Sequence, residues 1–210
     1  MDKILCYGDS NTWGAVPGSD ENRYDRDKRW PGVMRKELGK DYLVIEEGLN
    51  GRTTVWEDPI EGYKSGKQYL IPCLETHKPL SLVIIMLGTN DLKARFSATA
   101  YDIAEGAGAL VEMVSKSETG VDGGPPEVLL VTPPPTAEFD EYSELFAGAG
   151  EKSQKLSGEF RRVAEELNCG LLDAGEYITS SDLDGIHLEE KEHRKLGEVV
   201  ADRAVEILRG

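Results

Sequence analysis

The feature that most constrains the fold is the apolar run Leu82-Val83-Ile84-Ile85-Met86-Leu87, which does not alternate with polar residues. A strand with one solvated face alternates apolar and polar side chains, whereas a strand buried on both faces does not. We therefore predict that residues 80–87 form a strand that is covered on both sides. Such a strand is typical of a parallel sheet with helices on both of its faces.

Four further short apolar runs alternate with longer, helix-like stretches. Strands are predicted at residues 3–7, 42–45, 127–132 and 170–173, and helices at 29–38, 67–77, 99–117, 151–168 and 189–209. Because crossovers between parallel strands are right-handed, this order predicts an α/β fold, a three-layer α/β/α sandwich with a five-stranded parallel flavodoxin-like sheet. The Gly- and Pro-rich segment 117–126 is interpreted as a surface loop within a single domain spanning residues 1–210.

The charge balance narrows the range of partners, because 24 Lys and Arg stand against 39 Asp and Glu, a net charge of −15. A uniformly acidic surface repels the phosphates of nucleic acids and of anionic membranes, so we expect neither as a partner. The N-terminal residues contain neither a basic segment nor a long apolar stretch, so we expect no signal peptide. Cys6, Cys73 and Cys169 form no paired motif, which predicts buried thiols and a cytoplasmic location.

Small, polar and titratable residues follow the predicted strands, at the edge where parallel sheets bind their ligands. Ser10 comes directly after the first strand, and a serine needs a base before it can act as a nucleophile. His187 lies three residues after Asp184, with Gly185 between them to allow a sharp bend. An aspartate at that spacing can orient the imidazole as a base, although an incidental histidine in a capping loop fits equally well.

The other two histidines have less specific surroundings. His77 stands before Lys78-Pro79 at the end of a predicted helix, and His193 lies in the charged run Glu189-Glu190-Lys191-Glu192-His193-Arg194. We predict that both imidazoles are solvated.

Acyl transfer also requires donors that hold an oxyanion. The candidates are the backbone N–H of Ser10, a glycine N–H within residues 48–51 and the side-chain amide of Asn90. Glycine and asparagine are also common turn residues, so each of these alone is explained equally well by a turn.

Together these residues resemble the SGNH hydrolase superfamily, also called GDSL esterases. The similarity rests on Gly8-Asp9-Ser10, the glycine block at 48–51, Gly88-Thr89-Asn90-Asp91 and Asp184-x-x-His187, in this order over nearly the whole chain. Residues 7–14, 29–30, 46–54, 82–91 and 184–187 resemble the arylesterase and acyltransferase branch more closely. The chain departs from larger family members at Asn11, where leucine is common, and has no long lid-like insertion.

The resemblance implies a serine esterase that hydrolyses short-chain acyl esters of aryl or alkyl alcohols, with acyl transfer to alcohols as a second outcome. It implies Ser10 as nucleophile, His187 as base and Asp184 as the residue that orients the base. No cofactor and no metal is expected, because the sequence has no Walker A motif, no dinucleotide-binding glycine motif and no His/Cys ligand cluster.

The resemblance also assigns the oxyanion donors. They would be the N–H groups of Ser10 and Gly51 and the amide of Asn90, with Gly48 as a competitor for Gly51.

Aromatic and apolar residues near the motifs are candidates for the substrate pocket, although large aromatic side chains fill cores equally often. The candidates are Trp13, Trp30, Trp56, Phe96, Phe139, Phe146 and Ile186. We favour Trp13 and Ile186 for substrate binding, Ile186 because it stands between Asp184 and His187.

Two alternative functions stay open at this point. One is a carbohydrate O-acetyl esterase or a thioesterase of the same superfamily. The other is a non-catalytic, flavodoxin-like module that binds an anion at its strand ends and helix N-termini. The resemblance also implies a homo-oligomer, in which loops of neighbouring copies would narrow the pocket.

Overall fold

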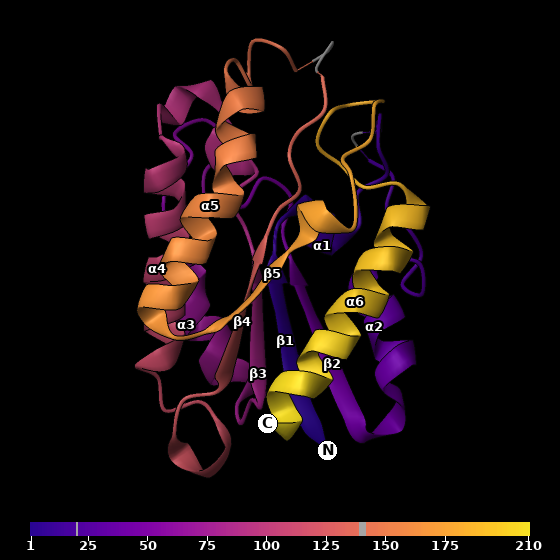
Figure 1. The fold of residues 1–210 in the computed structure, drawn as a ribbon, viewed down its shortest axis with the longest axis vertical. Coiled ribbons are helices and arrows are strands. Elements are labelled where there is room, and N and C mark those ends of the chain that lie inside the picture. The colour runs from indigo at the N-terminus through magenta and orange to yellow at the C-terminus, as the bar shows by residue number, and fades with distance from the viewer. Residues whose placement is uncertain (20, 139–141) are drawn as a thin grey trace.

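Five parallel strands form the centre of the molecule (Figure 1). The structure is a computed structural model that describes residues 1–19, 21–138 and 142–210. The strands are β1 (Asp2–Gly8), β2 (Tyr42–Gly48), β3 (Leu82–Met86), β4 (Glu127–Thr132) and β5 (Gly170–Asp173). Their order in the sheet is β2-β1-β3-β4-β5, which confirms the predicted flavodoxin-like arrangement.

Helices cover both faces of this sheet and complete the three predicted layers (Figure 1). One face carries α2 (Trp30–Leu38) and α6 (Glu190–Arg209). The opposite face carries α3 (Gly66–His77), α4 (Ala100–Ser115) and α5 (Ala149–Leu167).

The side chains of β3 alternate between two separate hydrophobic cores, which explains its uninterrupted apolar sequence. Leu82, Ile84 and Met86 pack under α2 and α6. Val83 and Ile85 pack under α3, α4 and α5. The strand is buried on both faces, as its sequence predicts.

The register of the sheet aligns the carboxyl ends of its central strands. Gly8 at the end of β1 is level with Gly48 of β2 and with Met86 of β3. The loops that follow these three strands therefore leave the sheet side by side. This alignment brings the predicted site residues to one edge.

A few local features differ from the sequence-based expectation. Leu80 lies outside β3 and instead forms an isolated bridge with Gly120. A short helix, α1 (Ser10–Trp13), follows β1 directly, and no hydrophobic period marks so short an element. Short 3-10 turns occur at Gly39–Asp41, Asn90–Leu92, Ala94–Phe96, Val121–Gly123 and Ala174–Glu176.

Two predictions about burial were wrong. His193 is fully buried rather than solvated, because α6 packs it against α2, where its Nδ1 accepts a hydrogen bond from Trp30 N–H. Burial lowers the pKa of His193 to about 3. Cys6 and Cys73 are buried as expected, whereas Cys169 is only half-buried at the end of α5.

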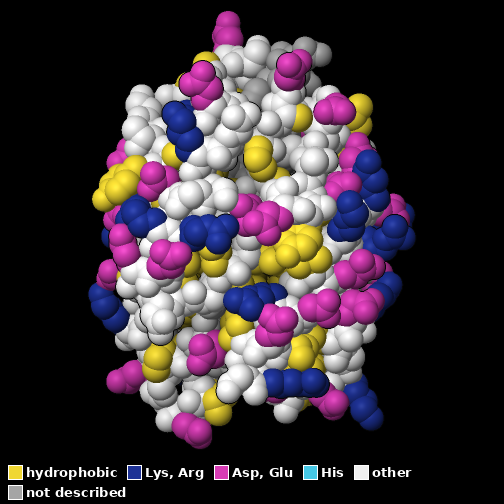
Figure 2. Space-filling model, viewed as in Figure 1, with side chains coloured by type: hydrophobic (Ala, Val, Ile, Leu, Met, Phe, Trp, Pro, Cys, Tyr) yellow, Lys and Arg dark blue, Asp and Glu magenta, His cyan; other side chains and the backbone are white. Residues whose placement is uncertain are grey.

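The surface is rich in charge. On the face shown in Figure 2, acidic side chains spread over the molecule with Lys and Arg interspersed among them. No helix within the described ranges has both the length and the apolar character that crossing a membrane requires.

Candidate functional site

Ser10 is the first residue of α1, directly beyond the carboxyl end of β1. The Asp9 carboxylate caps this helix by accepting a hydrogen bond of 2.9 Å from the N–H of Asn11. Gly14 ends the helix in a left-handed conformation after only one turn. This tight turn fixes Ser10 at the strand end, where 8% of the residue is exposed.

Ser10, His187 and Asp184 form a continuous hydrogen-bonded chain. The Ser10 Oγ hydroxyl lies 3.0 Å from Nε2 of His187, and Nδ1–H of His187 donates to Oδ2 of Asp184 over 2.8 Å. Gly185 has a φ of +80°, so the bend expected between the aspartate and the histidine is present. Asn11 Nδ2 also donates to the carbonyl of Ile186, which joins the Ser10 segment to the His187 segment.

The Asp184 carboxylate accepts four hydrogen bonds. Besides His187 Nδ1, its donors are the N–H groups of Gly18, Ile186 and His187. Burial alone would raise the pKa of Asp184, but the hydrogen bond and charge of His187 outweigh it and hold the pKa well below its usual value. A carboxylate held in this way stays ionised and fixes the tautomer of His187.

The three predicted oxyanion donors lie in the segments that follow β1, β2 and β3, at the carboxyl ends of these strands. Within the described part of the chain, neither Ser10 N–H nor Gly51 N–H has an intramolecular acceptor. Asn90 is buried, and one hydrogen of its Nδ2 binds the carbonyl of Arg52 over 3.2 Å. Its second amide hydrogen remains available for another acceptor.

The structure gives Gly48 and Gly51 different physical reasons to be glycine. A Cβ on Gly48 would lie 2.2 Å from the backbone nitrogen of Trp13, so Gly48 permits α1 to pack closely on β2. Gly51 has a φ of +79° in the loop after β2, a left-handed conformation that favours glycine.

Arg52 connects the segments that carry all three donors. Its guanidinium donates to the carbonyls of Gly8 and Glu47, and it lies over the ring of Tyr7 at 4.2 Å. Its own carbonyl accepts the hydrogen bond from Asn90. The side chain of Arg52 thus links the ends of β1 and β2, and its backbone carbonyl links them to the segment after β3.

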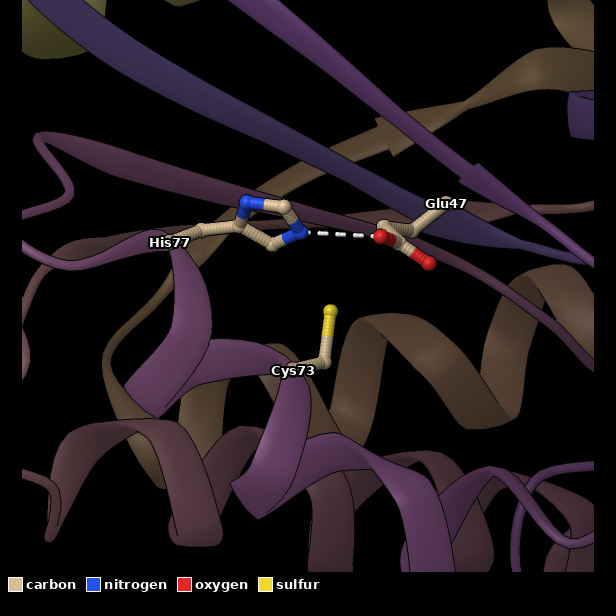
Figure 3. A group of neighbouring side chains, drawn as sticks. All are labelled: Glu47, Cys73 and His77. Carbon is tan, nitrogen blue, oxygen red and sulfur yellow. Dashed lines mark hydrogen bonds and ion pairs between the residues drawn. The ribbon is translucent and has the colours of Figure 1, made fainter.

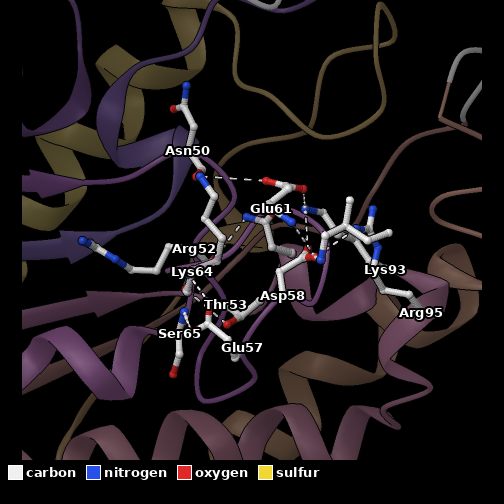
Figure 4. Close-up of polar contacts among 12 residues, drawn as sticks. Asn50, Arg52, Thr53, Glu57, Asp58, Glu61, Lys64, Ser65, Lys93 and Arg95 are labelled. Carbon is white, nitrogen blue, oxygen red and sulfur yellow. Dashed lines mark hydrogen bonds and ion pairs between the residues drawn. The ribbon is translucent and has the colours of Figure 1, made fainter.

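A network of charges holds the loop after Gly51 against the loop after Asn90 (Figure 4). The buried Asp58 carboxylate pairs with Lys93 at 3.6 Å and with Arg95 at 2.9 Å, and Lys93 also pairs with Glu61. Lys64 Nζ donates to the carbonyl of Asn50 over 2.8 Å. Buried ion pairs with several partners restrict relative movement, so this network stabilises the geometry of the two loops.

Two buried carboxyl groups lie beneath the site. Burial raises the pKa of Asp91 to about 7, although Thr54 donates to it from both its N–H and its hydroxyl. Burial likewise raises the pKa of Asp9 to about 6, and its charge contributes to the shift at Asp91.

The raised pKa of Asp91 makes stability depend on pH. An aspartate in the unfolded chain ionises near pH 4, so between about pH 4 and pH 7 the folded chain binds more protons than the unfolded one. The free energy of unfolding should therefore fall as the pH rises through this window. Urea unfolding at pH 5 and at pH 8 checks this. From pH 5 to pH 8, the free energy of unfolding should fall more for wild type than for Asp91→Asn. An equal pH dependence in both proteins would contradict the raised pKa.

The substrate-pocket candidates fall into different environments. Trp30 and Phe146 are fully buried in the two cores, so the proposal that they line a pocket was wrong. Trp13 is partly exposed, and the guanidinium of Arg23 lies 4.6 Å from the centre of its ring. Ile186 sits at the margin of the first core, with 8% of the residue exposed.

The structure does not place the remaining candidates in a substrate pocket. Trp56 and Phe96 are partly buried and pack against the first core. Phe139 lies outside the described residues.

Arg52, Asp91 and the Asp58–Lys93 pair are structural partners of the site to which the sequence analysis assigned no role. Arg52 and Asp91 directly follow Gly51 and Asn90 in the chain. Charged residues next to two oxyanion candidates were therefore the available signal. These residues are buried only because loops that are distant in sequence contact one another, and the sequence alone does not show those contacts.

The chain is similar to known proteins over nearly its full length. A model of the GDSL-like lipase/acylhydrolase family matches residues 6–195. The solved structure of the native aryl esterase of M. smegmatis is 42% identical, with a TM-score of 0.95 over 99% of this chain and 100% of that one. No protein in the curated set matches the sequence.

Two further solved structures are similar over nearly their full length. Est24, a carbohydrate acetylesterase from Sinorhizobium meliloti, is 42% identical with a TM-score of 0.95, over 98% of this chain and 99% of that one. The inhibitor-bound form of the M. smegmatis aryl esterase is 42% identical with a TM-score of 0.95, over 99% of this chain and 100% of that one.

Proposed function

Because the chain belongs to the GDSL-like lipase/acylhydrolase family and is a carboxylic ester hydrolase, we propose that it cleaves short-chain acyl esters with Ser10 as the nucleophile. The observation that carries this proposal is the hydrogen-bonded chain from Ser10 Oγ through His187 to Asp184, at 3.0 Å and 2.8 Å. Because the family consists of lipases and acylhydrolases, we no longer consider the alternative of a non-catalytic anion-binding module.

In the proposed reaction, His187 Nε2 accepts the hydroxyl proton as Ser10 Oγ attacks the ester carbonyl. Asp184 stabilises the imidazolium that forms and keeps it correctly oriented. His187 then returns the proton to the leaving alcohol, and an acyl-enzyme on Ser10 remains. Water releases the acid, and another alcohol in its place would give acyl transfer.

The tetrahedral oxygen would be held by Ser10 N–H, Gly51 N–H and the Asn90 amide. Gly51 is favoured over Gly48 because its N–H has no acceptor in the described structure, while the close approach of α1 explains Gly48. Arg52 would fix all three donors in place before substrate arrives, and such preorganised dipoles stabilise the transition state most effectively.

Asn90→Ala is expected to lower kcat by roughly 10²–10³-fold, about 2.7–4 kcal/mol, with KM little changed. The amide binds the developing oxyanion more strongly than the ground-state carbonyl, so its loss affects the chemical step. Steady-state kinetics with p-nitrophenyl acetate measures both constants. A raised KM with unchanged kcat would instead identify Asn90 as a residue that only positions substrate or forms a turn.

A carbohydrate O-acetyl esterase is the second candidate, because Est24 is as similar to this chain as the aryl esterase is. The two candidates share the same chemistry and differ in the alcohol side of the ester. A thioesterase activity is a further alternative on the same nucleophile.

Comparison of kcat/KM for p-nitrophenyl acetate, p-nitrophenyl octanoate and an acetylated monosaccharide tests the substrate class. We expect acetate to be preferred over octanoate, and we propose Trp13 and Ile186 as the residues that contact the small acyl or alcohol group. Faster turnover of octanoate would contradict the short-chain assignment. Preference for the acetylated sugar would favour the second candidate.

Domain organisation, compartment and assembly are proposals as well. We propose a single domain spanning residues 1–210, since strands from both halves of the chain enter one sheet. A cytoplasmic location is supported by the free thiols of Cys6, Cys73 and Cys169. A homo-oligomer is supported by Ile60 and Tyr63, which are 77% and 92% exposed on the loop beside Gly51.

A further inference from the structure

Glu47, Cys73 and His77 bring three metal-binding atoms together where α3 meets the edge strand β2 (Figure 3). A carboxylate oxygen, Sγ and an imidazole nitrogen all lie within 4.8 Å of one another. Within the residues that the structure describes, no other group of this kind occurs. None of its side chains belongs to the hydrogen-bonded chain of Ser10, His187 and Asp184, so the argument for this cluster does not rest on the proposed function.

The local structure explains why these atoms converge. Cys73 and His77 are four residues apart on α3, which places them on the same face of the helix. Glu47 lies near the end of β2, and its Oε1 is 2.8 Å from His77 Nε2. Figure 3 shows Cys73 Sγ pointing towards the space between the imidazole and the carboxylate.

We propose that Glu47, Cys73 and His77 bind one Zn²⁺ ion, which links α3 to the edge of the sheet. Thiolate, imidazole and carboxylate are the three ligand types that Zn²⁺ takes in proteins, and it prefers four ligands in a tetrahedron. The side chains of His77 and Glu47 are 24% and 22% exposed, so a water molecule can reach the cluster and supply the fourth ligand. The same opening is an entry path for the ion.

Charge balance favours a dication at this position. Binding forms a Zn–S bond and releases the Cys73 proton to solvent, with no change of oxidation state. The thiolate and the Glu47 carboxylate then neutralise the two positive charges, and His77 binds as the neutral imidazole.

Cys73 is fully buried on α3, and its Sγ lies close to the Glu47 carboxylate. The Arg52 guanidinium is the nearby cation that affects Cys73, and it is bound to the carbonyls of Gly8 and Glu47. Arg52 therefore binds the backbone of Glu47, and the Glu47 carboxylate binds His77.

The sequence analysis expected no metal site, and the reason lies in the spacing. The ligands Cys73 and His77 are visible as a Cys-x-x-x-His pair, which is too short to specify a site. Glu47 belongs to a different element, and only the packing of α3 on β2 brings it to the pair.

Competition with a chromogenic chelator tests the proposal on the purified full chain after removal of metals. Wild type is expected to withhold one equivalent of Zn²⁺ from the chelator. Cys73→Ala, His77→Gln and Glu47→Gln should each lose this binding, whereas Cys169→Ala, which removes the more exposed thiol, should retain it. Circular dichroism of every variant verifies that the fold is intact.

Substitution with Co²⁺ identifies the ligands directly. A thiolate-to-cobalt charge-transfer band is expected in wild type and Cys169→Ala and should be absent in Cys73→Ala. Zn²⁺ should also raise the thermal midpoint of unfolding of wild type but not that of His77→Gln. The His77 side chain is partly exposed, so this substitution tests the site without disturbing the core. Absence of Zn²⁺ binding in wild type, or binding that survives in Cys73→Ala and His77→Gln, would overturn the proposal.

Discussion

Ser10→Ala is expected to lower kcat for p-nitrophenyl acetate on the order of 10⁶-fold while leaving the protein folded. The methyl group cannot attack the ester, and a small residue at the start of α1 contributes little to packing. The short helix is capped by Asp9, which the substitution leaves in place. Activity assays and circular dichroism on the same preparation measure both parts of this expectation.

Ser117→Ala is a matched control for this variant. Ser117 is a partly buried serine just after α4, in the connection that leads to β4, and its hydroxyl donates to the carbonyl of Val114. Its substitution should leave kcat unchanged. Near-normal turnover by a folded Ser10→Ala protein would rule out Ser10 as the nucleophile.

His187→Gln is expected to reduce kcat by a similar factor, about 10⁶-fold, because members of a catalytic triad act as one unit. A glutamine amide is polar and can form hydrogen bonds, but it cannot accept the hydroxyl proton. Loss of activity with retained structure therefore reports the missing base and not a missing contact. The kinetics of the variant across a range of pH, beside wild type, provide the measurement.

The other histidines provide unequal controls for this experiment. His77→Gln should leave ester hydrolysis intact, because the His77 side chain at the end of α3 binds Glu47 and not Ser10 or Asp184. His193→Gln is unsuitable as a neutral control, because His193 is buried against Trp30 and Tyr24 and its loss should destabilise α6. A folded His187→Gln enzyme as active as His77→Gln would contradict the assignment of the base.

Much of this architecture follows from local sequence patterns. The apolar run of β3 requires two covered faces, and both cores are present on its two sides. Because parallel strands end at one edge, Ser10 after β1 and Asn90 after β3 could be expected to meet there. The bend at Gly185 brings Asp184 and His187 into contact within a single loop, which spacing alone can suggest.

Features that depend on packing between distant elements could not be predicted in the same way. His193 stands in a strongly charged run, and only the approach of α2 to α6 buries it. The choice between Gly48 and Gly51 depends on where α1 lies, and α1 is too short to leave a periodic signal. Trp30 and Phe146 are large aromatic residues of the kind that often line pockets. They belong to the cores because they pack against opposite faces of the sheet, which the residue type alone does not reveal.

Covalent labelling with an organophosphonate tests the central claim most directly, because it traps the nucleophile after attack. Wild type should lose activity in proportion to the incorporation of one phosphonyl group, and mass spectrometry should locate that group on Ser10. Ser10→Ala should incorporate none, and Asn90→Ala should be labelled more slowly because it holds the oxyanion-like adduct less well. Complete inactivation with Ser10 unmodified, or with the adduct on another residue, would contradict the account.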